Sequence, residues 1–186
     1  MKSNCVQLLL ICSTFTCIVS CKKSIDTSFA TPEEPGKTNF PVGLALSEPK
    51  ERPFKGRITG SFVSTPTSNP AIFNSVANAS GNTTHLGVFN KVTSDVINVA
   101  LSTVEGTFII TSQSGEQITG RYNGPFIFGA TPGTFSWELN ATITGGTGRF
   151  AYATGEFVFL ANGEYVISEG NVIGDYTETF DGAIIY

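Results

Sequence analysis

The chain has 186 residues, of which 15 are acidic and 11 are basic, and 40% are hydrophobic. This length supports one domain with its own core and requires no second one. Between Ile58 and Tyr186 three basic residues stand against ten acidic ones, and this negative charge argues against nucleic acid as a partner.

An apolar segment that follows a single basic residue opens the chain. Lys2 precedes the run from Val6 to Val19, which is too short to span a membrane and has the length of a secretory signal. We therefore predict a signal peptide over residues 1–20 and an exported protein.

The end of this segment, Ile18-Val19-Ser20-Cys21, resembles the bacterial lipobox, where a small residue precedes the cysteine that is lipidated. The other three cysteines lie inside the signal segment, so Cys21 has no disulfide partner. The resemblance implies that lipid on Cys21 anchors the protein to the outer membrane of a bacterial cell envelope, facing the periplasm or the exterior. Two or more acyl chains hold a protein without a transmembrane helix. The alternative is a signal peptide cleaved elsewhere, with Cys21 as a free thiol.

Residues 21–53 form the next predicted segment, a flexible tether. Residues 22–53 hold five of the nine prolines and show no sustained apolar period. A second interpretation is that Phe40 to Leu46 docks on the domain as an extra strand.

Short alternating segments follow from Phe54 to Tyr186. From Gly133 to Ile143 apolar and polar residues alternate, which predicts a half-buried strand. Similar runs are Phe54–Ser64, His85–Val92, Val96–Ser102, Thr107–Ser112, Gln117–Gly124, Arg149–Ala161, Glu164–Ile173 and Thr177–Tyr186. Eight or nine strands in sequence predict an all-β, antiparallel up-and-down barrel over residues 54–186, because closure removes exposed edges. Ser64 to Asn82 is predicted to be a long loop that covers one barrel mouth or packs against a neighbouring subunit.

A glycine-rich stretch, "ITGGTGRFAYATGEF" from Ile143 to Phe157, has two interpretations. Gly146 to Ala151 fits the dinucleotide fingerprint G-x-G-x-x-A, but that fingerprint needs a following helix, and aromatic residues and further glycines follow here. The favoured interpretation is a turn between strands, with Gly145, Gly146 and Gly148 as turn residues. Phe150 and Tyr152 have the opposite parity to Phe157 and Phe159, so a bend at Gly155 is required if both pairs face one side.

This stretch resembles the strand-turn-strand hairpin of the allene oxide cyclase barrel and of plant dirigent proteins. "FKGRITGSF" from Phe54 to Phe62 resembles their first strand, "TTHLG" from Thr83 to Gly87 resembles bacterial secreted members, and "FDGAIIY" fits a closing strand. The resemblance implies an eight-stranded antiparallel barrel, an apolar cavity and, in several relatives, a homo-trimer. It carries no catalytic residue to this chain, because the acidic motif of the cyclase first strand has no counterpart here.

Groups for catalysis or metal binding are scarce. His85 is the only histidine and no cysteine follows Cys21, so we predict no metal site and no cofactor. His85 is interpreted as a hydrogen-bonded structural residue, although its parity with Phe89 would also let it line the barrel. Glu138 is predicted to be solvated, and no carboxylate pair can be chosen from the sequence.

Aromatic residues are the remaining signal, with 15 Phe, five Tyr and one Trp. The candidate lining of an internal pocket is Tyr122, Phe135, Trp137, Phe157, Phe159 and His85. The alternative is a solid core, because a small barrel is often filled by its own side chains.

Three functions follow. We favour binding of a small hydrophobic ligand inside the barrel, with enzymatic activity less favoured. The first alternative is a cyclase- or isomerase-like enzyme that confines a hydrophobic substrate and predicts a buried carboxylate or histidine in the cavity. The second is a structural or self-associating surface protein, which predicts an exposed apolar patch.

Overall fold

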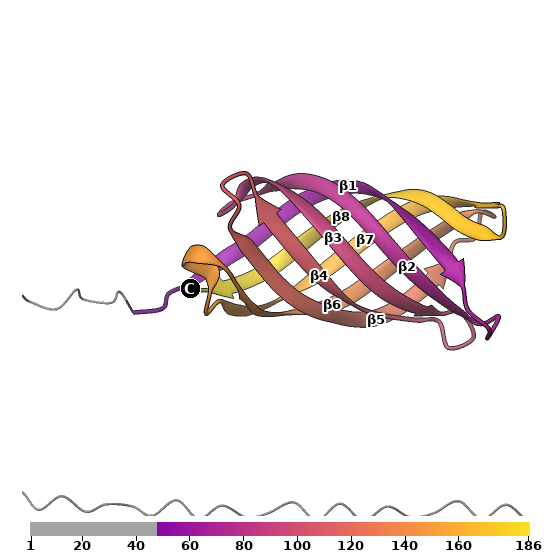
Figure 1. Cartoon of the computed structure of the whole chain (residues 1–186), viewed down its shortest axis with the longest axis horizontal. Helices are drawn as coiled ribbons and strands as arrows, with labels where there is room; N and C mark the ends of the chain where they lie inside the picture. The colour runs from indigo at the N-terminus through magenta and orange to yellow at the C-terminus, as the bar shows by residue number, and fades with distance from the viewer. Residues whose placement is uncertain (1–47) are drawn as a thin grey trace, which may run out of the picture. The chain divides into compact units, whose positions relative to one another are not determined.

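The computed structural model describes residues 48–186, which form a closed barrel of eight antiparallel strands in the order β1-β2-β3-β4-β5-β6-β7-β8 (Figure 1). The predicted signal peptide, Cys21 and the tether as far as Ser47 lie outside the described residues. Within residues 48–186 no helix is long and apolar enough to cross a membrane.

The strands are long and every turn between them is short. The bounds are β1 (Glu51–Pro66), β2 (Ile72–Thr83), β3 (Gly87–Asn98), β4 (Thr103–Ser112), β5 (Gln117–Phe128), β6 (Thr134–Gly146), β7 (Thr154–Ser168) and β8 (Asn171–Ile185), with one 3₁₀ turn, η1 (Gly148–Phe150). The predicted fold class, an eight-stranded up-and-down barrel, is confirmed, and the ninth strand is absent from residues 48–186.

Two predicted boundaries were wrong in the first half of the barrel. Residues 64–82 are not a loop, because β1 continues to Pro66 and β2 begins at Ile72 after a turn in which Asn69 accepts a hydrogen bond from Ala71 N. The predicted runs at His85–Val92 and Val96–Ser102 are not two strands, because both enter one strand, β3, which ends at Asn98, and residues 99–102 form the following turn. β2 escaped prediction because its inward positions carry small residues such as Ser75 and Ala77, which give no apolar alternation.

The run Glu164–Ile173 was also wrong as a single strand, because it contains the β7–β8 turn. Glu169 and Gly170 have φ of 50° and 82°, the positive values that a two-residue hairpin turn requires. β1 pairs with β8 from Glu51↔Ile185 onward, so the barrel begins three residues before Phe54.

Alternate residues of each strand face the interior. In β6 the buried hydrophobic side chains are Phe135, Leu139, Ala141 and Ile143, as the alternation predicts. One half of the interior is filled by aromatic rings, and adjacent ring centroids lie as close as 4.7 Å for Phe157 and Phe159. The rings at the centre of this cluster are Phe54, Phe89, Phe108, Phe157, Phe159 and Phe180.

The glycine-rich stretch lies at the end of the barrel that contains the C-terminus, next to the half filled by aromatic rings (Figure 1). Gly148 has φ of 58°, which permits the turn into η1. Phe150 is fully buried against Tyr186, with 4.7 Å between ring centroids, whereas Tyr152 is 95% exposed. β7 starts only at Thr154, so a turn does separate two strands here, but Arg149 does not begin the second strand. Of the three predicted turn glycines only Gly148 lies in the turn, because β6 continues through Gly145 to Gly146. We call this the closed end.

The strand register is irregular in the β5–β6 pair. The β5–β6 pairing shifts between Thr119 and Gly120, opposite Gly145, which has φ of 146°. Gly146 lies against Gln117 O, and Gly155, with φ of 151°, lies against the backbone of Ala183. Because Tyr152 points to solvent, Phe150 and Tyr152 do not both face the interior as Phe157 and Phe159 do.

We predict that Phe150→Ala lowers the free energy of unfolding by about 3–5 kcal/mol, because it empties a fully buried site that seals the closed end. Urea denaturation, followed by the emission of Trp137, measures this change. Tyr152→Ala is the matched control two residues away, and its effect is expected to stay within about 0.5 kcal/mol because its ring is exposed. Equal effects of the two substitutions would contradict this account of the closed end.

Candidate functional site

The other half of the interior is hollow. A cavity of about 270 Å³ lies at the end formed by the β1–β2, β3–β4, β5–β6 and β7–β8 turns, which we call the open end. Its rim is formed by Pro70, Phe73, Val99, Phe128, Ile167 and Val172. An apolar cavity of about 150 Å³ can hold a benzene molecule, so this one accommodates a single ring with a short side arm.

The walls are mostly aromatic. Phe126 stacks on Phe135 with 5.6 Å between centroids, and Trp137 lies 5.0 Å from Phe135. Tyr176 of β8 lies 5.4 Å from Trp137 and continues this wall. Smaller inward residues, among them Ala77 of β2, leave the space open. The lining is therefore apolar with a few polar groups, which is typical of small-molecule sites.

An ion pair forms the floor of the cavity. Lys91 of β3 donates to Glu178 of β8, and the side chains are 3% and 1% exposed. Trp137 Nε1 donates to the other carboxylate oxygen at 3.3 Å. Lys91 Nζ lies 3.9 Å from the centroid of the Phe159 ring, so the cation also contacts the aromatic core.

The charges of Lys91 and Glu178 neutralise each other. Burial raises the pKa of Glu178, while Lys91 and the hydrogen bonds from Lys91 and Trp137 lower it. The two opposite charges cancel, and the aromatic faces surround the ammonium. The pair therefore leaves no net charge at the floor.

A second carboxylate, Asp95, lies nearer the rim. Its Oδ1 accepts a hydrogen bond from Tyr122 Oη, and its Oδ2 accepts one from Thr93 Oγ1 at 3.0 Å. Gly106 of β4 pairs with both Asp95 and Tyr122, and a Cβ at this glycine would collide with the Asp95 carboxylate. The missing side chain of Gly106 thus lets the two residues meet across β4.

Burial perturbs this pair of groups. Desolvation raises the pKa of Asp95 to about 6, opposed by the hydrogen bonds from Tyr122 and Thr93. Burial and the neighbouring Asp95 raise the pKa of Tyr122, so its hydroxyl stays protonated and donates. Burial also raises the pKa of Tyr176. Groups perturbed in this way within a cavity are characteristic of functional sites.

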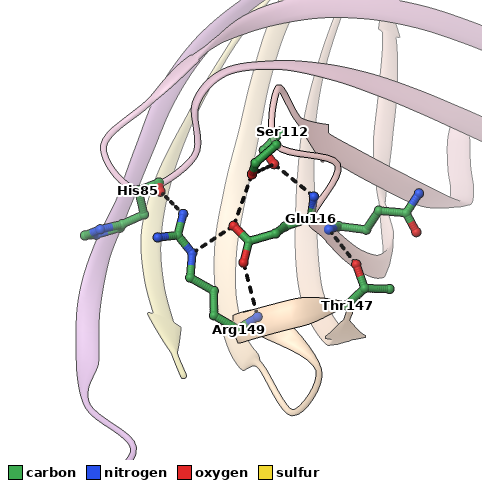
Figure 2. Close-up of polar contacts among 7 residues, drawn as sticks. His85, Ser112, Glu116, Thr147 and Arg149 are labelled. Atoms are coloured by element: carbon green, nitrogen blue, oxygen red, sulfur yellow. Dashed lines mark hydrogen bonds and ion pairs between the residues drawn. The ribbon is translucent and has the colours of Figure 1, made fainter.

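The closed end holds a separate polar network, drawn in Figure 2. Arg149 Nε lies 3.2 Å from Glu116 Oε2, and Arg149 Nη2 donates to His85 O at 2.8 Å. Thr147 Oγ1 accepts from Gln117 N at 2.9 Å, and Ser112 Oγ accepts from Glu116 N at 3.1 Å. These contacts tie η1 to the β2–β3 and β4–β5 turns, so Arg149 has a structural role.

The structure brings three of the six candidate lining residues together at the cavity: Tyr122, Phe135 and Trp137. Phe157 and Phe159 lie in the aromatic core beneath the floor and do not line the cavity. His85 lies at the closed end, where its Nε2 donates to Pro53 O at 2.8 Å. It follows Thr83, the last residue of β2, and precedes β3, so strand parity did not apply to it.

The charged residues of the site were not predicted from the sequence. Lys91 and Asp95 have the parity of the buried residues Phe89 and Ile97, and Glu178 has that of Phe180. The sequence signal that could have identified them is a charged residue at an inward position of a strand, between buried apolar residues. Across residues 48–186 no group of three His, Cys, Asp or Glu residues could hold a metal ion.

No protein-family model matches the chain, and no curated protein sequence matches it. Among solved structures, the pterocarpan synthase dirigent protein GePTS1 is similar, with a TM-score of 0.39 and 16% sequence identity. The similarity covers 79% of this chain and 96% of that chain. It concerns the barrel fold.

We predict that Asp95→Asn raises the free energy of unfolding at pH 8 by up to about 3 kcal/mol, because burial raises the pKa of Asp95 from 3.8 to about 6 and a pKa change of one is equivalent to about 1.4 kcal/mol. The folded state holds the Asp95 proton more tightly than the unfolded state, whose pKa is near 3.8. The stability of the wild type is therefore expected to fall, relative to the variant, as the pH rises from about 4 to about 6.

Urea denaturation between pH 3.5 and pH 8 measures this difference. Asp175→Asn, at an exposed position of β8, is the control and should follow the wild type at every pH. If the free energies of unfolding of wild type and Asp95→Asn ran parallel over this pH range, burial would not raise the pKa of Asp95.

Proposed function

We propose that the protein binds a small, largely hydrophobic molecule in the cavity at the open end of the barrel. The observation that carries this proposal is the contrast between the two halves of the interior: one is packed with rings, while the other leaves about 270 Å³ behind an apolar rim. A space of this kind costs stability when it is not filled, so a ligand offsets the cost.

The polar groups of the lining give such a ligand an orientation. Lys91, Asp95, Tyr122 and Glu178 all lie on the lining, whereas the rim is apolar. A ligand with one polar end would place that end inward and its apolar body toward the rim.

An enzymatic alternative rests on Asp95. A carboxylate with a pKa of about 6, held against Tyr122, has the acidity of a general acid or base near neutral pH. The cyclase- or isomerase-like hypothesis predicted a buried carboxylate in the cavity. Deuterium exchange next to the carbonyl of 4-phenyl-2-butanone would test it, and equal exchange by wild type and Asp95→Asn would eliminate Asp95 as the base.

Self-association, including a homo-trimer, is proposed from an apolar row on the outer surface. Val166, Ile173, Val63 and Val76 are successive cross-strand partners over β7, β8, β1 and β2. Val166 is 61% exposed and Val76 is 50% exposed. Such a patch suits contact with another copy. Sedimentation equilibrium would report a trimer, and a monomer at high concentration would contradict the proposal.

We also propose that lipid on Cys21 anchors the barrel in a bacterial cell envelope, at the outer membrane. The support is the lipobox-like sequence that ends at Cys21, after an apolar segment of signal-peptide length. Metabolic labelling with an alkyne-bearing palmitate tests this. Wild type should take up label and Cys21→Ala should not, and equal labelling would refute the anchor.

We predict that 2-phenylethanol binds in the cavity and changes the emission of Trp137, the only tryptophan of the chain. Ala77→Met places a longer side chain in the cavity and is expected to weaken binding tenfold or more. Val76→Met adds the same side chain at the adjacent outward position and should bind as the wild type does. Unchanged affinity in Ala77→Met would place the binding site elsewhere.

A further inference from the structure

The charges that line the cavity do not balance. Lys91, Asp95 and Glu178 are the lining residues that carry a formal charge, one positive and two negative. Lys91 and Glu178 form an ion pair with each other. The three ion pairs among residues 48–186 join Lys55 to Asp181, Lys91 to Glu178 and Arg149 to Glu116, so none includes Asp95.

The hydrogen-bond partners of Asp95 do not neutralise it. Tyr122 and Thr93 each donate one hydrogen bond, and both are neutral hydroxyls. A carboxylate offers about four acceptor positions, so about two remain available. Because the pKa of Asp95 is about 6, most of the population is ionised at pH 7.5.

The walls around this carboxylate favour a positive charge. Trp137, Tyr176 and Phe135 present aromatic rings to the cavity, and an ammonium within about 6 Å of a ring centroid is attracted to its face. The chain itself uses this interaction, because Lys91 Nζ lies 3.9 Å from the Phe159 ring centroid and 5.9 Å from that of Tyr176.

We propose that the ligand is a small amine, whose ammonium donates to Asp95 and contacts the aromatic wall while its apolar body extends toward the rim. This proposal rests on the proposed function and specifies its ligand class. The volume suits one ring on a short arm. An anionic ligand would face two carboxylates, and the single cation, Lys91, is already paired with Glu178.

Three ligands of similar shape and different charge test the proposal: 2-phenylethylamine, 2-phenylethanol and phenylacetate. Isothermal titration uses the full chain in phosphatidylcholine nanodiscs at pH 7.5, with empty nanodiscs as the blank. We expect the amine to bind at least tenfold more tightly than the alcohol, and phenylacetate to bind most weakly. Tighter binding of the alcohol or the acid would overturn the amine assignment and leave the proposed function standing. Binding of none of the three would count against the proposed function itself.

Asp95→Asn adds a second arm. The ratio of amine to alcohol affinity should collapse toward one in this variant and should persist in Asp175→Asn, which removes an exposed charge outside the cavity. A ratio that survives in Asp95→Asn would overturn the role of Asp95. If that variant does not fold, the three-ligand comparison on the wild type still decides the proposal.

A pH series adds a third arm. The amine stays protonated throughout, so its affinity should be highest above pH 6 and should fall as Asp95 becomes protonated below it. The titratable groups around Asp95 are Lys91, Glu178, Tyr122 and Tyr176, and both tyrosines have raised pKa values. An amine affinity that does not change between pH 7.5 and pH 5 would contradict an ionic contact with Asp95.

Discussion

Cross-strand pairing of phenylalanine with glycine is the constraint on which this barrel depends. An eight-stranded barrel has an interior just wide enough for its side chains. In this chain, inward-facing rings lie over glycines of the neighbouring strand, where a Cβ would collide with the ring. The pairs are Phe180 with Gly56, Phe108 with Gly120, Phe135 with Gly163 and Phe62 with Gly174. In each pair the glycine has no side chain, and the ring from the neighbouring strand occupies the space that a side chain would fill. Large rings therefore fit inside the closed barrel.

The polar floor of the cavity depends on the rings beneath it. Phe159 provides the aromatic face over which Lys91 lies, and Lys91 neutralises Glu178. Glu178 in turn orients Trp137 by accepting from its indole nitrogen. Removing one partner of a buried pair leaves an uncompensated charge, which is among the more destabilising changes a core can suffer. The contacts of Lys91 and Glu178 therefore belong both to the top of the aromatic core and to the floor of the cavity.

Much of this fold was predictable from the sequence, because strand period and turn glycines are local properties. β6 followed from the alternation that begins at Phe135, whereas β2 was missed because its inward positions carry residues as small as Ser75. Parity could also have placed Lys91 and Glu178 inside the barrel. Their meeting could not be predicted, because they are 87 residues apart and the register of all intervening strands decides it. The position of the cavity is likewise a result of packing.

The fully buried carboxylate Glu178 and the partly buried carboxylate Asp95 have different surroundings. Glu178 has a cation, an indole donor and the aromatic core around it, so the fold alone accounts for it. Asp95 has two neutral donors, and burial raises its pKa to about 6, so the ionised form costs stability near neutral pH. A neutral side chain of the same shape would relieve that cost. Where a protein keeps a group that its own packing disfavours, the compensating interaction is commonly functional. The cationic ligand that we propose would supply, inside the cavity, the charge that the barrel does not.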